Sequence, residues 1–197
     1  MVRADWFMVS GHWVLAGGEH SEVYFDKMQL LSDPDLLETA VDQIWWKIQD
    51  AFGPWLDVDV FAGPTTGGAI VAYSLASMLY KKVAYIERVK EGSSIRENRR
   101  GYLIQPGDNV IILDDVLTTG RSLMETYRAV VEKGGNVRCA AVLMNRSNND
   151  VDYPFPLFSL WQDNIYTWTP DNCPMCADGV YPAVKPGTTT ELPGHTQ

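Results

Sequence analysis

The chain has 197 residues, 46% of them hydrophobic, and a formal net charge of −9. This length and apolar content suffice for the core of one domain. Binding to a nucleic-acid backbone depends on clustered Lys and Arg, so the acidic balance argues against a general nucleic-acid binder. We therefore expect small molecules or other proteins as partners.

The sequence also lacks the usual targeting features. It contains no run of about 18 apolar residues, and residues 1–13 do not have the basic-then-apolar layout of a signal peptide. Its three cysteines are too few for a disulfide framework in a chain of this length. These features predict a cytoplasmic protein with no membrane partner.

The first clear element is a helix that begins near Ser32. Ser32 or Asp33 can cap its N-terminus, and Pro34 suits its first turn. Apolar residues then recur on one face, at Leu37, Val41, Ile44, Trp45, Ile48 and Phe52. The pattern predicts an amphipathic helix that buries one side.

Strands and helices then alternate along the chain. The predicted strands are residues 58–62, 83–88, 110–114, 137–144 and 157–161, and the predicted helices between them are residues 68–80 and 121–133. This order predicts a parallel sheet of about five strands with helices on both faces, and ligands at the carboxyl ends of the strands.

The two ends of the chain do not fit the alternation. We therefore predict one domain over 1–197, with a core at about 33–161 and a small hood from about 1–32 and 162–181. The tail 182–197 is rich in Pro, Gly and Thr and is predicted to be flexible.

The segment Val110 to Ser122, VIILDDVLTTGRS, combines an acidic pair with a polar turn. Backbone N–H groups at the start of the following helix, with Gly120 and neighbouring hydroxyls, suit a phosphate. Asp114 and Asp115 would repel that phosphate unless they face sugar hydroxyls or a metal ion. A ribose 5-phosphate meets both conditions, whereas an ordinary strand-end acidic pair beside a helix cap is the alternative.

This segment resembles the phosphoribosyl-pyrophosphate (PRPP) motif of the type I phosphoribosyltransferases, which has four apolar residues, two acids and TTG. The resemblance implies a Rossmann-like α/β fold, PRPP and a heterocyclic base as substrates, Mg²⁺ bound mainly through PRPP, and a homodimer. In that family the acids hold the ribose hydroxyls and the turn holds the 5-phosphate. The PRPP-binding residues implied here are Asp114, Asp115, Val116, Leu117, Thr118, Thr119, Gly120, Arg121 and Ser122.

A second Gly-rich loop, residues 63–68, joins the first core strand to its helix. It is either a tight turn or a second anion site, and it resembles the pyrophosphate loop of the family. That loop often carries a Lys, whereas this chain has Thr66 or Gly67 there, so backbone amides around Thr65, Thr66 and Gly67 would bind the leaving group.

A cationic segment follows between residues 88 and 100. Its basic residues are Arg88, Lys90, Arg96, Arg99 and Arg100. It is either a solvated mobile loop or a lid that closes over pyrophosphate and excludes water. The orotate branch of the family has a Lys-rich lid with a His, and no His is present here. Arg88 and Lys90 match that lid in part, so they join Asp115 as the candidate catalytic residues, and which cation contacts pyrophosphate is left open.

Residues 15–26 resemble an orotate phosphoribosyltransferase segment in which an aromatic pair, here Tyr24 and Phe25, lies against the orotate ring. Ala16 replaces the Lys of that segment, which weakens the case for an anionic base such as orotate. His20 is either a substitute cation or a surface histidine.

Arg146 follows the strand 137–144, where the orotate enzymes have an Arg that meets the orotate carboxylate. The resemblance makes Arg146 and Thr118 further candidates for base binding, while an Arg that snorkels at a strand end is the alternative. Orotate is the expected base. Another purine or pyrimidine salvage transferase and a non-catalytic PRPP-sensing regulator are the alternatives.

The pair Cys173 and Cys176 forms a C-P-x-C motif similar to the tails of some orotate-like phosphoribosyltransferases. It is a structural turn, half of a zinc site completed by another segment or a second subunit, or a redox pair. The three histidines of the chain offer no obvious second half at ligand spacing.

Overall fold

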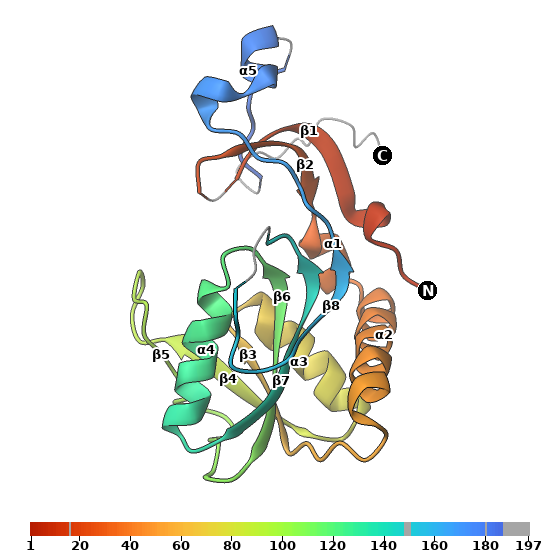
Figure 1. The fold of residues 1–197 in the computed structure, drawn as a ribbon, viewed down its shortest axis with the longest axis vertical. Helices are drawn as coiled ribbons and strands as arrows, with labels where there is room; N and C mark the ends of the chain where they lie inside the picture. The colour runs from red at the N-terminus through yellow and green to blue at the C-terminus, as the bar shows by residue number, and fades with distance from the viewer. Residues whose placement is uncertain (16, 148–150, 180, 187–197) are drawn as a thin grey trace. The chain divides into compact units, whose positions relative to one another are not determined.

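The computed structural model describes residues 1–15, 17–147, 151–179 and 181–186 (Figure 1). Contacts along the chain divide it into two units. The larger unit contains residues 1–2 and 27–163, and the smaller one contains residues 3–26 and the described residues from 164 onward.

The larger unit is built on a six-stranded sheet with the order β5-β4-β3-β6-β7-β8. The strands are β3 (Val60–Pro64), β4 (Lys82–Arg88), β5 (Arg96–Glu97), β6 (Asn109–Leu117), β7 (Asn136–Asn145) and β8 (Leu157–Gln162). All neighbours pair in parallel except β4 and β5, which are antiparallel. The predicted parallel α/β sheet is therefore confirmed, with one short strand added at its edge.

Four helices belong to this unit: α1 (Lys27–Leu31), α2 (Pro34–Phe52), α3 (Gly67–Met78) and α4 (Arg121–Glu132). In α2 the cap is Asp33 rather than Ser32, because the Asp33 carboxylate accepts from the N–H groups of Asp35 and Leu36. Helices α2 and α3 cover one face of the sheet and α4 covers the other (Figure 1).

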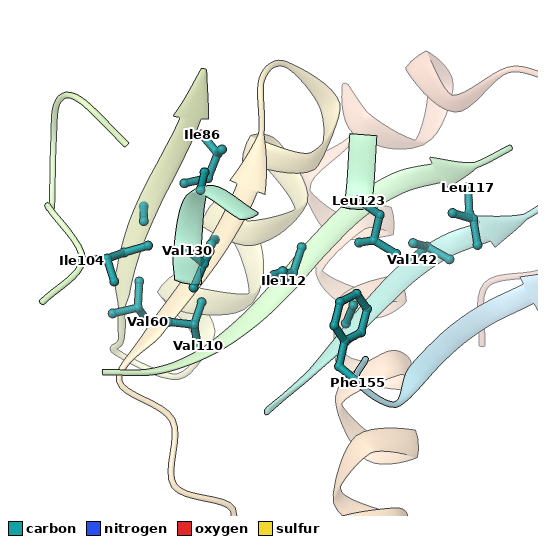
Figure 2. Packing of buried hydrophobic residues seen from close by; sticks show 14 residues of the cluster. Val60, Ile86, Ile104, Val110, Ile112, Leu117, Leu123, Val130, Val142 and Phe155 are labelled. Carbon is teal, nitrogen blue, oxygen red and sulfur yellow. The ribbon is translucent and has the colours of Figure 1, made fainter. Parts of the chain in front are cut away.

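The core beneath α4 follows from the alternation of side chains along each strand. Val60, Val110, Ile112 and Val142 form one cluster with Leu123 and Val130 of α4, and all six are almost completely buried (Figure 2). Intervening residues such as Phe61 point to the opposite face, where the Phe61 ring meets Trp45 of α2. The sheet is thus buried on both faces, which explains its nearly continuous apolar strands.

Two sequence predictions for this unit are wrong in detail. The acidic pair was expected where the strand 110–114 ends, but β6 continues through it to Leu117 because β7 pairs along this whole stretch. The stretch 88–100 was expected to be a loop without strand structure, either solvated or a lid, but Arg96 and Glu97 pair with the end of β4 and form β5.

The smaller unit consists of the hairpin β1 (Met8–Val14) and β2 (His20–Phe25), flanked by the 3-10 helix η1 (Ala4–Phe7), and of the C-terminal elements η2 (Pro170–Asn172) and α5 (Pro174–Asp178). Trp168 pairs with His20, and Val184 pairs with Trp13. Val184 lies near the start of the tail that was predicted to be flexible, so this part of the tail is paired. Its part 187–197 lies outside the described residues. None of the described helices has the length and apolar character needed to span a membrane.

Candidate active site

The acidic pair lies inside β6, and neighbouring side chains on a strand point to opposite faces. Asp115 faces Lys27 of α1, whose Nζ lies 2.6 Å from its Oδ2. Its other carboxylate oxygen accepts a hydrogen bond from the backbone N–H of Val116 at 2.6 Å. Local sequence patterns did not single out Lys27, because 88 residues separate it from Asp115.

Asp114 points to the face covered by α4 and is buried, with 7% of its surface exposed. Its Oδ1 accepts from the backbone N–H of Asp115 at 2.9 Å. Burial, followed by the charge of Asp115, raises the pKa of Asp114 to about 7, although hydrogen bonds from the Asp115 backbone and Ser122 oppose the shift. One of the two acids therefore titrates near neutral pH.

The turn between β6 and α4 has the geometry of an anion site. Gly120 adopts a left-handed conformation with φ of 74° immediately before α4. Thr118 and Thr119 are exposed on this turn, and the first backbone N–H groups of α4 have no acceptor within the helix. The motif residues thus present hydroxyls and amides together, as the sequence predicted.

Tyr153 closes this turn from the segment between β7 and β8, and sequence reasoning missed it. Its hydroxyl lies against Gly120, where any side chain would collide with it. That hydroxyl is buried and has no hydrogen-bond partner among the described residues, and burial raises the pKa of Tyr153. A buried donor without an acceptor is therefore held beside the phosphate turn.

The Gly-rich loop between β3 and α3 packs directly against the acidic pair. A Cβ on Gly67 would overlap the Asp115 carboxylate, and one on Gly68 would come within 2.8 Å of Asp114 Oδ1. Thr65 and Thr66 are exposed on the loop, and the peptide bond between them is cis. The two predicted anion loops thus meet at one edge of the sheet, with the carboxylates between them.

The cationic segment is fastened to α4 through one buried carboxylate, that of Glu125. Arg96 Nε lies 3.1 Å from Glu125 Oε2, Arg121 Nε lies 2.8 Å from Oε1, and Arg88 Nη2 lies 3.5 Å from Oε2. Burial alone would raise the pKa of Glu125, but the arginines outweigh it and lower that pKa. Three arginines against one carboxylate leave a net charge of +2 beside the phosphate turn.

The other cations of this segment are more exposed. Arg100 pairs with Glu87 at 2.5 Å, Arg99 Nη2 donates to the Arg88 carbonyl at 3.0 Å, and Lys90 is exposed in the turn between β4 and β5. The picture of a freely solvated loop is therefore wrong for Arg96, which is buried. The catalytic roles of Arg88 and Lys90 stay predictions.

Arg146 directly follows β7, and its backbone N–H donates to the Leu117 carbonyl at 2.8 Å. This hydrogen bond places Arg146 beside Thr118, so two of the predicted base-binding residues lie on adjacent strand ends. Their role as base ligands stays a prediction.

The aromatic pair of β2 is divided between two faces of its hairpin. Tyr24 packs against Trp13 with ring centroids 5.5 Å apart, and buried Phe25 packs edge-on against Phe7 at 6.2 Å. Because adjacent strand residues point in opposite directions, the two rings cannot lie against the same face of one base. At most one of the two predicted rings can therefore stack on the base.

The sequence analysis singled out two further positions in or near this hairpin, His20 and Ala16. His20 is not a surface histidine, because it is buried with its Nδ1 2.9 Å from Nε2 of His12, and its suggested role as a substitute for the missing Lys stays a prediction. Cys176 lies against the same histidine pair. The substitution at Ala16 lies outside the described residues.

Comparison with known proteins assigns this site to a family. A model of the phosphoribosyl transferase domain matches residues 29–167, and the chain belongs to this family of transferases. Orotate phosphoribosyltransferase of Carboxydothermus hydrogenoformans is 37% identical over 181 residues, covering 92% of this chain and 91% of the relative. The enzyme of the same name from Pelotomaculum thermopropionicum is 36% identical, with 92% and 90% covered.

Solved structures agree on the fold. The orotate phosphoribosyltransferase of Aeropyrum pernix superimposes with a TM-score of 0.64 at 26% identity, covering 79% of this chain and 88% of that one. Adenine phosphoribosyltransferase of Saccharomyces cerevisiae has the same TM-score at 19% identity, covering 80% and 96%. At that identity the second likeness concerns the fold alone.

Proposed function

We propose that the protein transfers the 5-phosphoribosyl group of PRPP to orotate and releases pyrophosphate. The observation that carries the proposal is the joint geometry of the acidic pair and the two anion loops, in a chain whose relatives named orotate phosphoribosyltransferase align over most of its length. The C1–O bond to pyrophosphate breaks, the C1–N bond to the base forms, and the base nitrogen loses its proton.

The chain's own residues act in this reaction by binding and by placing charge. Asp114 and Asp115 accept hydrogen bonds from the ribose hydroxyls, and the turn 118–122 holds the 5-phosphate. Amides of the loop 63–68 and the arginine cluster around Glu125 stabilise the negative charge that grows on pyrophosphate as the bond breaks. No protein nucleophile is needed, because fixed geometry and charge complementarity lower the barrier.

Mg²⁺ is the cofactor in this proposal. At least three of the four oxygens of the acidic pair already face donors: the Asp115 and Val116 amides and Lys27, and Ser122 also hydrogen-bonds Asp114. The pair therefore suits an ion held mainly by substrate phosphates with one or two carboxylates, which is the usual manner of Mg²⁺, and such an ion neutralises phosphate charge when bound. Chelation is expected to abolish turnover and added Mg²⁺ to restore it.

A panel of bases tests the substrate. Pyrophosphate release is measured with PRPP, Mg²⁺ and, in turn, orotate, uracil, adenine, hypoxanthine and guanine. Release with orotate supports the proposal, release with a purine or uracil alone favours a salvage transferase, and no release with any base favours a PRPP-sensing regulator.

Arg146 provides the residue-level test of the same proposal. Arg146→Gln is expected to raise the KM for orotate about 10-fold or more, as for a lost charge-assisted hydrogen bond, with the KM for PRPP unchanged. The matched control is Arg138→Gln, an exposed arginine on the same strand, β7. Equal orotate KM values in both variants would remove Arg146 from the base site.

The proposal includes a homodimer. Large apolar side chains are exposed on and after α2, with Trp46 64% and Trp55 92% exposed, and a partner subunit that covered them would remove this apolar surface from water. Sedimentation equilibrium measures the mass directly, and a single-chain mass at micromolar concentration would contradict this part.

A further inference from the structure

Four side chains with metal-binding atoms meet in the smaller unit: His12, His20, Cys173 and Cys176. One ligand atom from each lies within 4.8 Å of all the others. His12, His20 and Cys173 are buried, and Cys176 is exposed. The phosphoribosyl transfer proposed above makes no use of these four groups.

The spacing of the four atoms matches the edges of a small tetrahedron. His12 Nε2 lies 2.9 Å from His20 Nδ1 and 3.4 Å from Cys173 Sγ. Cys176 Sγ lies 3.6 Å from His12 Nε2 and 3.3 Å from His20 Nδ1. A zinc ion about 2.0 Å from nitrogen and 2.3 Å from sulfur gives ligand–ligand edges of about 3.3–3.8 Å. Of these four distances, only the one between the two nitrogens would have to lengthen, by a few tenths of an ångström, and the remaining two are no longer than 4.8 Å.

A β-bulge in the hairpin brings the two histidines to one face. Ser10 pairs with Val23, but three residues later Trp13 pairs with Ser21, so β1 has one extra residue between them. Beyond the bulge Val14 lies opposite His20, and His12, two residues before Val14, therefore faces the same side. Without the bulge the two imidazoles would point to opposite faces.

The cysteines approach from the C-terminal segment. Cys173 precedes α5, and Cys176 lies within its single turn, so the C-P-x-C spacing directs both sulfur atoms toward the hairpin. Backbone hydrogen bonds hold this segment on both sides, since Trp168 exchanges two with His20 and the Val184 N–H donates to the His12 carbonyl at 2.8 Å. The site is thus positioned by backbone pairing as well as by its ligands.

A further contact orients His12 for a metal. Its Nδ1 lies 2.8 Å from the backbone carbonyl of Tyr181. A carbonyl only accepts, so Nδ1 is the donor in this contact and Nε2 is the ring nitrogen that faces the cluster. A histidine held by a carbonyl on its second nitrogen is the usual arrangement around protein-bound zinc.

We propose that these four residues bind one zinc ion, which fastens the C-terminal segment to the N-terminal hairpin. Two thiolates balance the charge of the ion, and this favours the burial of His12, His20 and Cys173. All four positions of the tetrahedron are protein ligands, so the site is structural and leaves no position for water or substrate. The expectation that the histidines offer no second half is therefore corrected: the two halves come from opposite ends of the chain.

Metal content tests the site without reference to catalysis. Protein purified without chelator or affinity tag is analysed by elemental mass spectrometry, and about one zinc per chain is expected. After removal of zinc, Co²⁺ should bind with the visible ligand-field and thiolate-to-cobalt absorption bands of a tetrahedral site. No bound zinc, and no such spectrum from reduced protein with added Co²⁺, would overturn the proposal, as would a Cys173–Cys176 disulfide in freshly purified protein.

Single variants then assign the ligands. Cys176→Ala and His20→Gln should each weaken Co²⁺ binding on the order of 100-fold or more and shift the spectrum of any bound cobalt. The control is Cys139→Ala, because Cys139 lies in β7 of the other unit, and its metal content should be unchanged. If a variant does not fold, thiol labelling of the unaltered chain tests the site instead. Added zinc should protect two of the three cysteines from the labelling reagent. Equal labelling of all three with and without zinc, or full metal content in both ligand variants, would refute the site.

Discussion

The substitution Asp114→Asn should change how the stability of the protein depends on pH. Burial, followed by the neighbouring charge of Asp115, raises the pKa of Asp114 from an ordinary value of 3.8 to about 7. The folded state therefore binds a proton at Asp114 more tightly than the unfolded state does. The contribution of Asp114 to the free energy of unfolding is fully present below pH 4 and is lost as the pH rises to 7. Three pKa units correspond to at most about 4 kcal/mol.

Roughly 2–3 kcal/mol of that loss should fall between pH 5 and pH 8. In Asp114→Asn this part of the pH dependence disappears, because the amide has nearly the same shape, accepts the same hydrogen bond from the Asp115 N–H and does not ionise. Urea unfolding at pH 5, 6, 7 and 8 measures the difference. The control is Asp50→Asn, an exposed carboxylate at the end of α2.

The same shift has a consequence for substrate binding. Only ionised Asp114 is a full acceptor for the ribose hydroxyls, so PRPP affinity should rise with pH up to about 7 and then level off. Calorimetric titration from pH 5.5 to 8 detects this. If the stabilities of the wild-type protein and Asp114→Asn ran parallel over pH 5 to 8, Asp114 would not be the titrating group and the reasoning would fail.

Three further substitutions probe contacts around the site. Glu125→Gln leaves Arg88, Arg96 and Arg121 without their buried counter-charge. The free energy of unfolding, measured in urea, should fall by about 3 kcal/mol. A fall below ~0.5 kcal/mol would mean that the cluster does not stabilise the fold. Lys27→Met removes the cation 2.6 Å from Asp115 and leaves that buried carboxylate without its counter-charge, so the free energy of unfolding should fall by about 1–3 kcal/mol, whereas an unchanged free energy of unfolding would show that Lys27 does not stabilise the acid. Tyr153→Phe removes a hydroxyl that has no partner among the described residues, so the unfolding free energy should stay equal or rise while the KM for PRPP increases about 3- to 10-fold; an unchanged KM would exclude Tyr153 from phosphate binding.

Local patterns in the sequence predicted those parts of the protein that depend on neighbours along the chain. The segment Val110 to Ser122 contains strand, acids, turn and helix start in one stretch, so its chemistry was readable without a structure. The helix α2 was predicted for the same reason, because its cap and apolar face are local features. The class of fold followed from the alternation of such segments.

The partners of these residues came only from the tertiary structure. Glu125 looked like an ordinary helical acid, and only folding places it between Arg96, 29 residues earlier, and Arg121 in its own helix. The short strand β5 was missed because two residues give no periodicity, and pairing with β4 alone defines it.

The smaller unit shows most clearly which features the sequence predicts and which features only the tertiary structure decides. The C-P-x-C motif was visible in the sequence, but its complement was not, because 161 residues separate Cys173 from His12 and because a single bulge in the hairpin decides that His12 and His20 share a face. Spacing along a chain predicts which residues share one helix or strand. Long-range pairing and packing decide which segments meet. A long-range contact of this kind also brings Lys27 of α1 to Asp115.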